Sequence, residues 1–403
     1  MRILHTSDWH LGRTFVQASL LDDQQQFLDW LVATVVAERI DLVVVAGDVF
    51  DRAVAPTEAV VMFRDVLRRL AGRTKVAVIT GNHDGADRVA TYGDLLDLSG
   101  VLVRGGYGSI GEVLTVSFDD GPLDVVLLPF LDPQVAPDDY PSDDASVVKA
   151  DGTGDGTGDA FARRIRRTHQ SVLATAADVA RASLRSPRSL AVAHAFVTGG
   201  TVSDSERQLV VGGTGTVEAS IFAPFSYTAL GHLHRPQDVA APSGRVRYSG
   251  TPLAYSFSEQ HAKSITIVDL AADGACTVTE VPVPVGRAVL TVTGAIDDLL
   301  AATPSPAAAD SWVRVVLTDP GVVLDSKARL AQVYPHVIEI LHEPTHTGAE
   351  LVAGLGAGRR RSMTAAEVAG EFWRAANQTD PSDDERELLF AALATAESEA
   401  QAR

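Results

Sequence analysis

Cysteine, aromatic side chains and long apolar runs are all scarce in this chain. Its 403 residues include one cysteine, Cys276, and aromatic residues make up 6% of the total. A single thiol excludes an internal disulfide framework and suits a reducing compartment, so we expect a cytoplasmic protein. No apolar run approaches the roughly 18 residues that a membrane span needs, which predicts no membrane association. The chain opens directly into an expected strand, and we therefore expect no signal segment.

Positive charge is also in short supply. Lysine and arginine number 34 against 52 aspartates and glutamates, which gives a net charge of −18. Nucleic-acid binding normally leaves a basic footprint, so any such footprint must be local in this chain. Part of the acidity is confined to residues 132–159, which contain eight aspartates and one lysine. Few apolar residues could anchor this segment, and we predict a flexible loop.

Five short apolar runs along the chain end in histidine, aspartate or asparagine. The run at 76–80 leads into Gly81, which allows a sharp turn, and then into an amide, an imidazole and a carboxylate. Ligands collect beyond the carboxyl ends of parallel strands, so we expect these side chains to face a cleft. The residues that follow the five runs are Asp8 with His10, Asp48, Asn82 with His83 and Asp84, His194, and His232 with His234.

These residue types are the ones that bind divalent metals. Carboxylate, imidazole and amide oxygen form the ligand set of ions such as Mn²⁺, Fe²⁺ and Zn²⁺. The spacings D-x-H at 8–10 and H-x-H at 232–234 each place both side chains on one side of an extended chain. A satisfied histidine or a capping aspartate would explain any one strand end, but that explanation would have to hold five times. The pattern therefore predicts a site for two metal ions.

Strand and helix patterns alternate along the first part of the chain. The alternation predicts βαβ units and an α/β fold with helices packed on a sheet. The expected strands lie at 1–7, 41–46, 76–80, 123–130, 189–193 and 227–230, and the expected helices at 20–40, 56–70, 88–100 and 160–184. Two further runs, 245–250 and 264–270, are predicted to be antiparallel strands that complete a second sheet.

The pattern changes near residue 284, and a chain of this length exceeds one ordinary core. We expect three parts: residues 1–283, a small unit at 284–347, and a linker with a helical tail at 348–403. The small unit has strand patterns at 288–292, 312–318 and 337–341 and helical patterns at 296–302 and 326–333. In the tail, capping-box pairs predict two helix starts, at Thr364 with Glu367 and at Ser382 with Glu385.

The order of the polar blocks resembles one known family. D-x-H at 8–10, G-D at 47–48, G-N-H-D at 81–84, His194 and G-H-x-H at 231–234 stand as in the calcineurin-like metallophosphoesterases. Within that superfamily, the segments GDVFDRAVAP, GHLHRP and YSGTPLAYSFSE are similar to the bacterial SbcD-type nuclease subunits. The resemblance covers residues 1–285 strongly and the remainder weakly. It implies a sandwich of two mixed sheets flanked by helices, a small α+β capping domain and a C-terminal helical tail.

The resemblance also implies a role for each polar residue. One metal ion would be held by Asp8, His10, Asp48 and His234, and the other by Asp48, Asn82, His194 and His232, with Asp48 bridging. The two ions, Mn²⁺ by resemblance, would activate water for attack on a phosphodiester. His83 would then protonate the leaving oxygen, and Asp84 would orient His83. Archaeal and eukaryotic relatives have a histidine where this chain has Asp51, and the role of Asp51 stays open.

Two functions remain open at this point, besides a pseudoenzyme that only binds. The resemblance implies a nuclease that works with an SbcC-like SMC-type ATPase. It would act in DNA repair, recombination and replication as an ATP-dependent exonuclease on double-stranded ends and an endonuclease on hairpins and single strands. The alternative is a small-molecule phosphodiesterase or phosphatase on the same fold. The extra unit and tail favour a large substrate or a partner.

The resemblance further implies a homodimer within a heterotetramer. We expect the unit at 286–347 and the arginines at 163–167 and 245–247 to contact DNA phosphates, although a solvated helix face would equally explain the first arginine group. Neither tail helix has enough large apolar residues to be stable alone, so the tail must pack on itself, on the body or on a partner. We expect the tail to dock on the ATPase.

Overall fold

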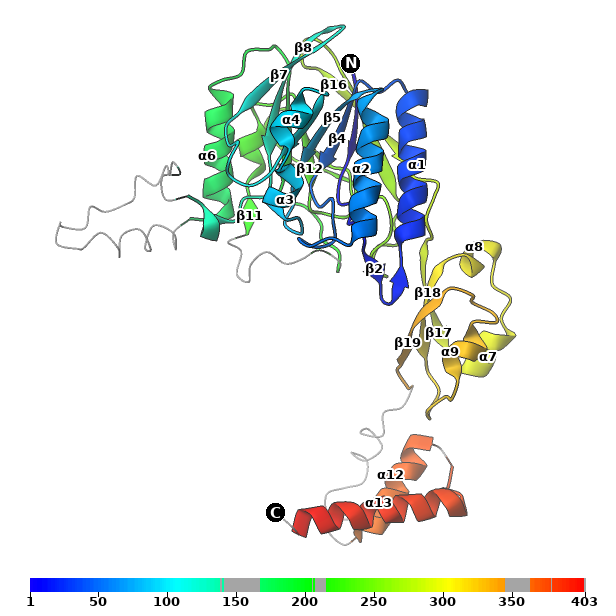
Figure 1. The fold of residues 1–403 in the computed structure, drawn as a ribbon. Helices are drawn as coiled ribbons and strands as arrows, with labels where there is room; N and C mark the ends of the chain where they lie inside the picture. Colours follow the sequence, from blue (N-terminus) through cyan, green and yellow to red (C-terminus); the bar gives the residue numbers. More distant parts are fainter. Residues whose placement is uncertain are drawn as a thin grey trace, which may run out of the picture. The chain divides into compact units, whose positions relative to one another are not determined.

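The computed structural model describes residues 1–137, 140, 167–204, 206, 215–344, 363–377 and 379–401. It divides into a first unit, Met1–Arg287, and a second unit, Ala288–Arg403 (Figure 1). Most of the acidic segment expected at 132–159 lies outside the described residues, as do Arg163, Arg164 and Arg166 and the linker expected at 348–361. The division into three parts therefore stays a prediction.

The first unit is built on two six-stranded sheets. The first sheet has the strand order β16-β15-β1-β4-β5-β6. Strands β1, β4, β5 and β6 are parallel to one another. Strand β15 pairs antiparallel with β1, and β16 pairs antiparallel with β15. Its strands are β1 (Arg2–Thr6), β4 (Leu42–Ala46), β5 (Lys75–Ile79), β6 (Val101–Arg104), β15 (Ser264–Leu270) and β16 (Cys276–Pro282). The parallel strands are joined by helices, as the sequence predicts.

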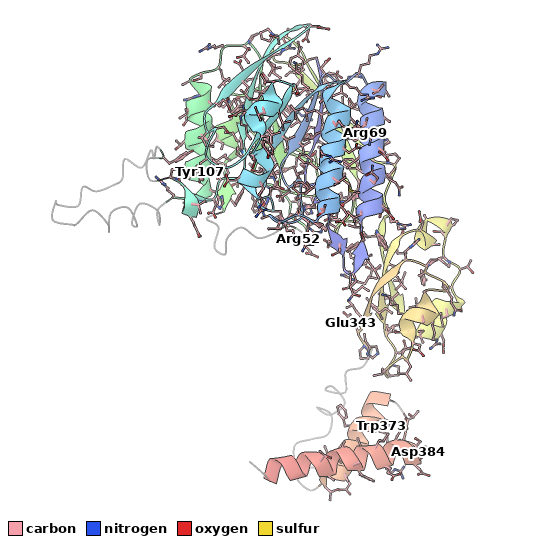
Figure 2. All side chains as sticks on the ribbon, in the orientation of Figure 1. Arg52, Arg69, Tyr107, Glu343, Trp373 and Asp384 are labelled. Carbon is pink, nitrogen blue, oxygen red and sulfur yellow. The ribbon has the colours of Figure 1, made fainter. Side chains whose placement is uncertain are left out.

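Two long helices lie side by side over one face of this sheet (Figure 1). They are α1 (Leu21–Ala37) and α2 (Thr57–Ala71). Each presents a stripe of apolar side chains at helical spacing to the sheet, with Leu31 on α1 and Leu70 on α2 both fully buried. On the outside, Arg69 of α2 pairs with Asp29 of α1 at 2.5 Å (Figure 2).

The second sheet has the order β13-β14-β12-β9-β8-β7, with parallel strands at its centre and antiparallel strands at its edges. Its strands are β7 (Val113–Phe118), β8 (Gly121–Leu128), β9 (Ser189–His194), β12 (Tyr227–Gly231), β13 (Gln237–Val239) and β14 (Arg245–Tyr248). The expected antiparallel pair at 245–250 and 264–270 is wrong. β14 runs parallel to β12 in this sheet, whereas β15 pairs with β1 in the first sheet.

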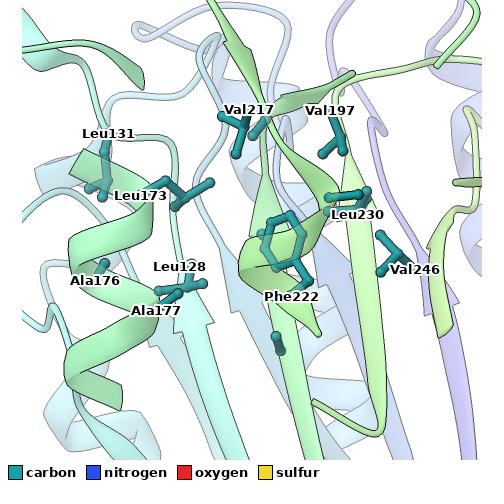
Figure 3. Packing of buried hydrophobic residues seen from close by; sticks show 14 of the residues in the cluster. Leu128, Leu131, Leu173, Ala176, Ala177, Val197, Val217, Phe222, Leu230 and Val246 are labelled. Carbon is teal, nitrogen blue, oxygen red and sulfur yellow. The ribbon is translucent and has the colours of Figure 1, made fainter. Parts of the chain in front are cut away.

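Apolar side chains from both sheets fill the space between them, and a second core lies on the outer face of the second sheet. The inner core includes Leu42 and Val44 of β4 and Leu190 and Val192 of β9. The outer core packs α6 (His169–Arg181) on the second sheet, with Ala177 of α6 beside Leu128 of β8 (Figure 3). A capping box between Thr168 and Ser171 starts α6 at residue 169, and residues 160–166 of the predicted helix lie outside the described residues.

The prediction of one continuous helix at 88–100 is wrong. The segment is divided into α3 (Ala86–Ala90) and α4 (Gly93–Asp97). The break falls at Thr91 and Tyr92, and α4 begins at Gly93, where a Cβ atom would collide with the carbonyl oxygen of Val103 on β6. The close approach to the sheet edge therefore requires glycine here. The first unit also contains short elements: β2 (Thr14–Phe15), β3 (Ala18–Ser19), β10 (Phe196–Val197), β11 (Thr216–Val217), and the 3₁₀ turns Pro133–Val135 and Ala219–Phe222.

The second unit contains a three-stranded parallel sheet and two helices of the tail. The sheet order is β17-β18-β19, and its core includes Val313, Leu330 and Tyr334. Its elements are β17 (Val289–Gly294), α7 (Ile296–Ala301), α8 (Pro306–Ala309), β18 (Trp312–Leu317), α9 (Ser326–Leu330) and β19 (Val337–His342). The three strands and the two helices predicted for the small unit are all present.

The tail forms two helices, α12 (Ala365–Asn377) and α13 (Asp383–Gln401), which carry Trp373 and Asp384 (Figure 2). Both predicted capping boxes are formed. Glu367 N–H donates to Thr364 Oγ1 at 3.2 Å and Thr364 N–H donates to Glu367 Oε2 at 2.7 Å, and Ser382 and Glu385 repeat the pattern. Across the described ranges of the chain, none of the helices combines the length and the apolarity needed to span a membrane.

Candidate metal centre

The polar residues predicted from the sequence lie where five parallel strands end. Asp8 and His10 follow β1, Asp48 follows β4, Asn82, His83 and Asp84 follow β5, His194 ends β9, and His232 and His234 follow β12. The ends of the two sheets are in contact, because His194 Nδ1 lies 2.9 Å from the carbonyl oxygen of Ala46 at the end of β4. A Cβ atom at Gly231 would overlap that same oxygen. The structure therefore brings the nine residues to one edge of the sandwich.

Four of these residues have backbone conformations that side chains normally avoid. Asp8, His10, Asp48 and His232 have φ angles of 53°, 44°, 48° and 108°. Each such residue costs on the order of 1–3 kcal/mol, and such strain is concentrated at functional sites. Seven residues other than glycine have positive φ in the described part of the chain, so more than half of them belong to this cluster. The fold holds these side chains in directions that relaxed strand ends would not provide.

The first group of candidate ligands is Asp8, His10 and His234, all fully buried. The Nε2 atoms of His10 and His234 are 3.3 Å apart and so face the same point. Asp8 accepts the backbone N–H of His232 at 3.0 Å, which ties the end of β1 to the end of β12. The three side chains have ligand atoms within 4.8 Å of one another.

The second group is Asn82, His194 and His232. Asn82 Oδ1 lies 3.0 Å from His194 Nε2 and 3.0 Å from His232 Nδ1. Asp48 lies between the two groups, because its Oδ2 is 3.7 Å from His10 Nε2 and 3.6 Å from His194 Nε2. This is the position that a bridging carboxylate requires. Gly81 makes it possible, since a Cβ atom there would overlap Asp48 Oδ1.

The hydrogen-bond pattern fits a cation site. A carbonyl oxygen only accepts, so His194 Nδ1 must donate to Ala46, and its Nε2 then directs a lone pair at the Asn82 oxygen. His234 Nδ1 contacts the Glu259 carboxylate at 3.0 Å, so its Nε2 likewise presents a lone pair towards His10. The two acceptors His194 Nε2 and Asn82 Oδ1, so close together, repel unless a cation lies between them. Among the described residues, the buried atoms His10 Nδ1 and Asn82 Nδ2 also have no hydrogen-bond partner.

The electrostatics of the protein alone leave the site short of positive charge. Burial lowers the pKa of His10, His194 and His232, so these imidazoles are neutral and available as ligands. Burial, and next the charge of Asp48, raise the pKa of Asp8 well above its usual range. A divalent cation would reverse this penalty, because it favours ionised carboxylates and neutral imidazoles. The donor set therefore fits metal ions.

The surroundings of His83 differ from the expected arrangement. His83 Nδ1 lies 2.8 Å from the carbonyl oxygen of Asp51, which must accept its proton, and His83 Nε2 lies 4.0 Å from Asp48 Oδ2. Asp84 instead accepts the backbone N–H groups of Val49, Phe50 and Gly81. Burial and then Asp48 raise the pKa of Asp84 to about 7. Asp84 therefore fastens the loop after β4 to the loop after β5, and the orienting contact expected from it is made by Asp51.

Sequence reasoning missed the residues that surround the ligands. Glu259 and Tyr255 lie on the segment between β14 and β15, and both are buried against His234. The segment at 248–259 carries the family resemblance, but nothing in its sequence assigned a role to either residue. The expected role of Arg247 in DNA contact is wrong, because this side chain is 4% exposed and pairs with Asp238 and Glu280. Arg167 also bonds the carbonyl oxygens of Ala136 and Pro137.

Comparisons with known protein families agree with this geometry. The family described as calcineurin-like phosphoesterase matches residues 1–144. A second family, described as the type 5 capsule protein repressor C-terminal domain and designated SbcD_C, matches residues 285–377. The first match includes Asp8, His10, Asp48 and the G-N-H-D block, and the second includes the three-stranded sheet of the second unit and α12.

The chain is also similar to individual proteins. It is 38% identical over 284 residues to the SbcD subunit of the SbcCD nuclease of Bacillus subtilis (strain 168), a match that covers 67% of this chain and 66% of the relative, just under two thirds of its length. A solved structure from Thermus thermophilus has a TM-score of 0.37 and 11% identity, covering 69% of this chain and 98% of that one. The GAP50 inner-membrane-complex anchor of Plasmodium has a TM-score of 0.40 and 11% identity, covering 86% and 98%. Both TM-scores are too low to support any further comparison.

Proposed function

We infer that this chain is an SbcD-type member of the calcineurin-like phosphoesterases and a nuclease subunit that hydrolyses DNA phosphodiester bonds with two divalent metal ions. The observation that carries the proposal is the convergence of seven ligand side chains from five strand ends on one buried point. Asp8, His10, Asp48 and His234 would hold one ion, and Asp48, Asn82, His194 and His232 the other. We propose Mn²⁺ for both.

Bound ions would supply the Lewis-acid charge that phosphodiester hydrolysis needs. The protein's own contribution is position and proton transfer. The strained backbone at Asp8, His10 and Asp48 fixes the ligands before any ion binds, so little reorganisation is required. His83 is oriented by the Asp51 carbonyl, and its Nε2 faces the cluster from one side. We propose that His83 is the general acid that protonates the leaving oxygen.

We propose a complex with an SbcC-like SMC-type ATPase, acting in the cytoplasm in DNA repair, recombination and replication. The activities proposed are ATP-dependent exonuclease on double-stranded ends and endonuclease on hairpins and single strands. Support for a partner comes from the tail, where large apolar side chains remain exposed on both helices. They are Val368 and Phe372 on α12 and Leu388 and Phe390 on α13. Exposed apolar patches of this kind mark interaction surfaces.

A homodimer within a heterotetramer is proposed on similar grounds. Apolar residues of the first unit are exposed at α2 and around α4. They are Val60, Val61, Tyr92, Leu95 and Leu98, the last with 89% of its surface exposed. A second copy of the chain would remove this surface from water.

The test uses the full chain with Mn²⁺ and two groups of substrates. Linear duplex, hairpin and single-stranded DNA form one group, and cyclic nucleotides with phosphomonoesters form the other. We expect cleavage of DNA that requires Mn²⁺ and is lost in Asp48→Ala. ATP should stimulate duplex cleavage only when the ATPase is added. Hydrolysis confined to the small substrates would contradict the nuclease proposal and support the alternative phosphodiesterase.

A further inference from the structure

We propose that Glu259, balanced by Lys263, is the positioning residue for His234 and thereby sets the affinity of the site that contains Asp8, His10 and His234. The inference deepens the proposed function and rests on its metal site. It also gives a role to the segment 248–259, which the sequence singles out but which supplies none of the proposed ligands. Glu259 would act through His234 and would not contact substrate.

The contact between Glu259 and His234 is direct and buried from solvent. Glu259 Oε1 lies 3.0 Å from His234 Nδ1, and both side chains are almost completely buried, with residue exposures of 1% each. A carboxylate only accepts, so Nδ1 carries the proton. The lone pair of Nε2 is then directed at the point that His10 Nε2 also faces, 3.3 Å away. A carboxylate behind a metal-binding histidine fixes the tautomer and the ring plane and raises the basicity of the ligand.

The carboxylate is itself held at its second oxygen. Thr251 Oγ1 donates to Glu259 Oε2 at 3.1 Å, and the Lys263 ammonium contacts the same oxygen. Lys263 Nζ also donates to Thr251 Oγ1 at 2.7 Å. A buried carboxylate needs a counter-charge, because an unpaired charge in the interior is strongly unfavourable. Lys263 therefore supplies the counter-charge for Glu259 at the place where His234 needs an acceptor.

Tyr255 completes the support on the other side of the ring. Its aromatic ring packs edge-on against both His10 and His234, with centroids 5.3 Å and 6.0 Å away. Residues 251–263 thus contact one ligand through a hydrogen bond and two through ring packing. All of these contacts belong to the first ligand group. The second group, with Asn82 and His194, is oriented instead by the carbonyl of Ala46. The two metal positions therefore have separate supports, and a change at Glu259 should affect only one of them.

A purely structural role for Glu259 is the competing explanation, since the same contacts also join the segment to the sheet. The test compares Glu259→Met, which removes the acceptor at similar volume, with Glu259→Gln, which retains one oxygen. Asp124→Asn is the matched control. Asp124 is also a fully buried carboxylate that accepts hydrogen bonds, from the backbone of Arg185 and Ser186, but it pairs with Ser189 at the start of β9, the end of that strand away from His194.

Two readouts are needed in the full chain. In calorimetric titration with Mn²⁺, we expect Glu259→Met to weaken one of two binding events about 10- to 100-fold and to leave the other nearly unchanged. Glu259→Gln should recover most of the loss, and Asp124→Asn should bind as the original chain does. In ¹⁵N NMR of the metal-free original chain, the His234 ring, assigned by its loss in His234→Asn, should be protonated at Nδ1.

Unchanged Mn²⁺ affinity in Glu259→Met, or an equal loss at both binding events, would overturn the positioning role. An Nε2-protonated His234 would overturn it as well, and this measurement remains decisive if Glu259→Met does not fold. Failure of the proposed function has a different signature. In that case the original chain would bind two Mn²⁺ ions, with His234 protonated at Nδ1, and would still leave DNA uncut.

Discussion

The imidazole of His83 is held by the main-chain carbonyl of Asp51, 2.8 Å from Nδ1, and not by a carboxylate side chain. The orientation of His83 therefore does not depend on which side chain stands at position 51. The Asp51 carboxylate points elsewhere and pairs with Arg13 at 3.2 Å. This explains how aspartate is compatible with a site whose archaeal and eukaryotic relatives place histidine at that position.

The first prediction separates proton transfer from metal binding. His83→Ala should reduce DNA cleavage about 10²- to 10⁴-fold, the usual contribution of a general acid, while Mn²⁺ affinity stays nearly unchanged. Asp48→Ala should abolish Mn²⁺ binding, because Asp48 Oδ2 lies close to a histidine of each ligand group. Calorimetry and a nuclease assay on the same preparations measure both quantities. If His83→Ala loses its metal as Asp48→Ala does, His83 is a ligand and not the acid.

The second prediction concerns the space around Asp48. Gly81→Ala should impair Mn²⁺ binding although it adds a single methyl group, since that methyl would overlap the Asp48 carboxylate. Gly72→Ala is a suitable control, because a Cβ atom there meets no atom within 4 Å. Wild-type Mn²⁺ affinity in Gly81→Ala would show that the loop after β5 can move away without cost.

The candidate site was predictable because its ligands are local to strand ends. An apolar run that ends in a polar residue is visible in a few consecutive residues, and five such ends recur, three of them with a glycine before the polar residue. The support for these ligands was not predictable in that way. Glu259 lies 25 residues after His234 in a segment without strand or helix periodicity. Asp51 contributes through its backbone, which leaves no trace in the sequence.

The same distinction applies to the fold. The long helices and the buried parallel strands β1, β4, β5, β8, β9 and β12 were predicted, because their apolar patterns are strong, but the short buried strand β6 was missed. Strand β16 was missed, since its residues alternate between half-buried and exposed at a sheet edge. The predicted pairing of β15 with β14 was wrong, and β15 pairs with β1 instead, because β15 is buried on both faces. Such a strand fits either sheet, and only packing across more than 250 residues of chain decides between them.

The third prediction uses a histidine outside the metal site. Burial, and then Arg247, lower the pKa of His5 to about 3, and its ring nitrogens contact the Tyr227 hydroxyl and the Leu230 carbonyl between the sheets. A pKa lower in the folded than in the unfolded chain contributes stability that is present above about pH 6.5 and lost as the pH falls towards 3. The slope is at most about 1.4 kcal/mol of unfolding free energy per pH unit.

We therefore expect His5→Asn to make the stability of the metal-free chain less dependent on pH between about 6.5 and 4. Urea unfolding in the presence of a chelator measures this at several pH values. Tyr227→Phe removes one hydrogen bond but no group that titrates in this range, so its stability should be lower by a constant amount. Parallel pH profiles for His5→Asn and the original chain would contradict the proposed burial of a neutral His5.

The last prediction concerns the tail. A chain ending at Gly358 should keep Mn²⁺-dependent nuclease activity but lose co-purification with the ATPase and any stimulation by ATP. A finer variant replaces Phe372 and Phe390 with serine. Both side chains are about half exposed, at 54% and 46%, so the substitutions should leave the helices and their capping boxes intact. Loss of apolar contact area at a partner surface should then weaken the complex at least tenfold. Val322→Ser, at a residue 86% exposed in the sheet-containing part of the second unit, is the control. Tight ATPase binding by the truncated chain would place the docking surface outside the tail.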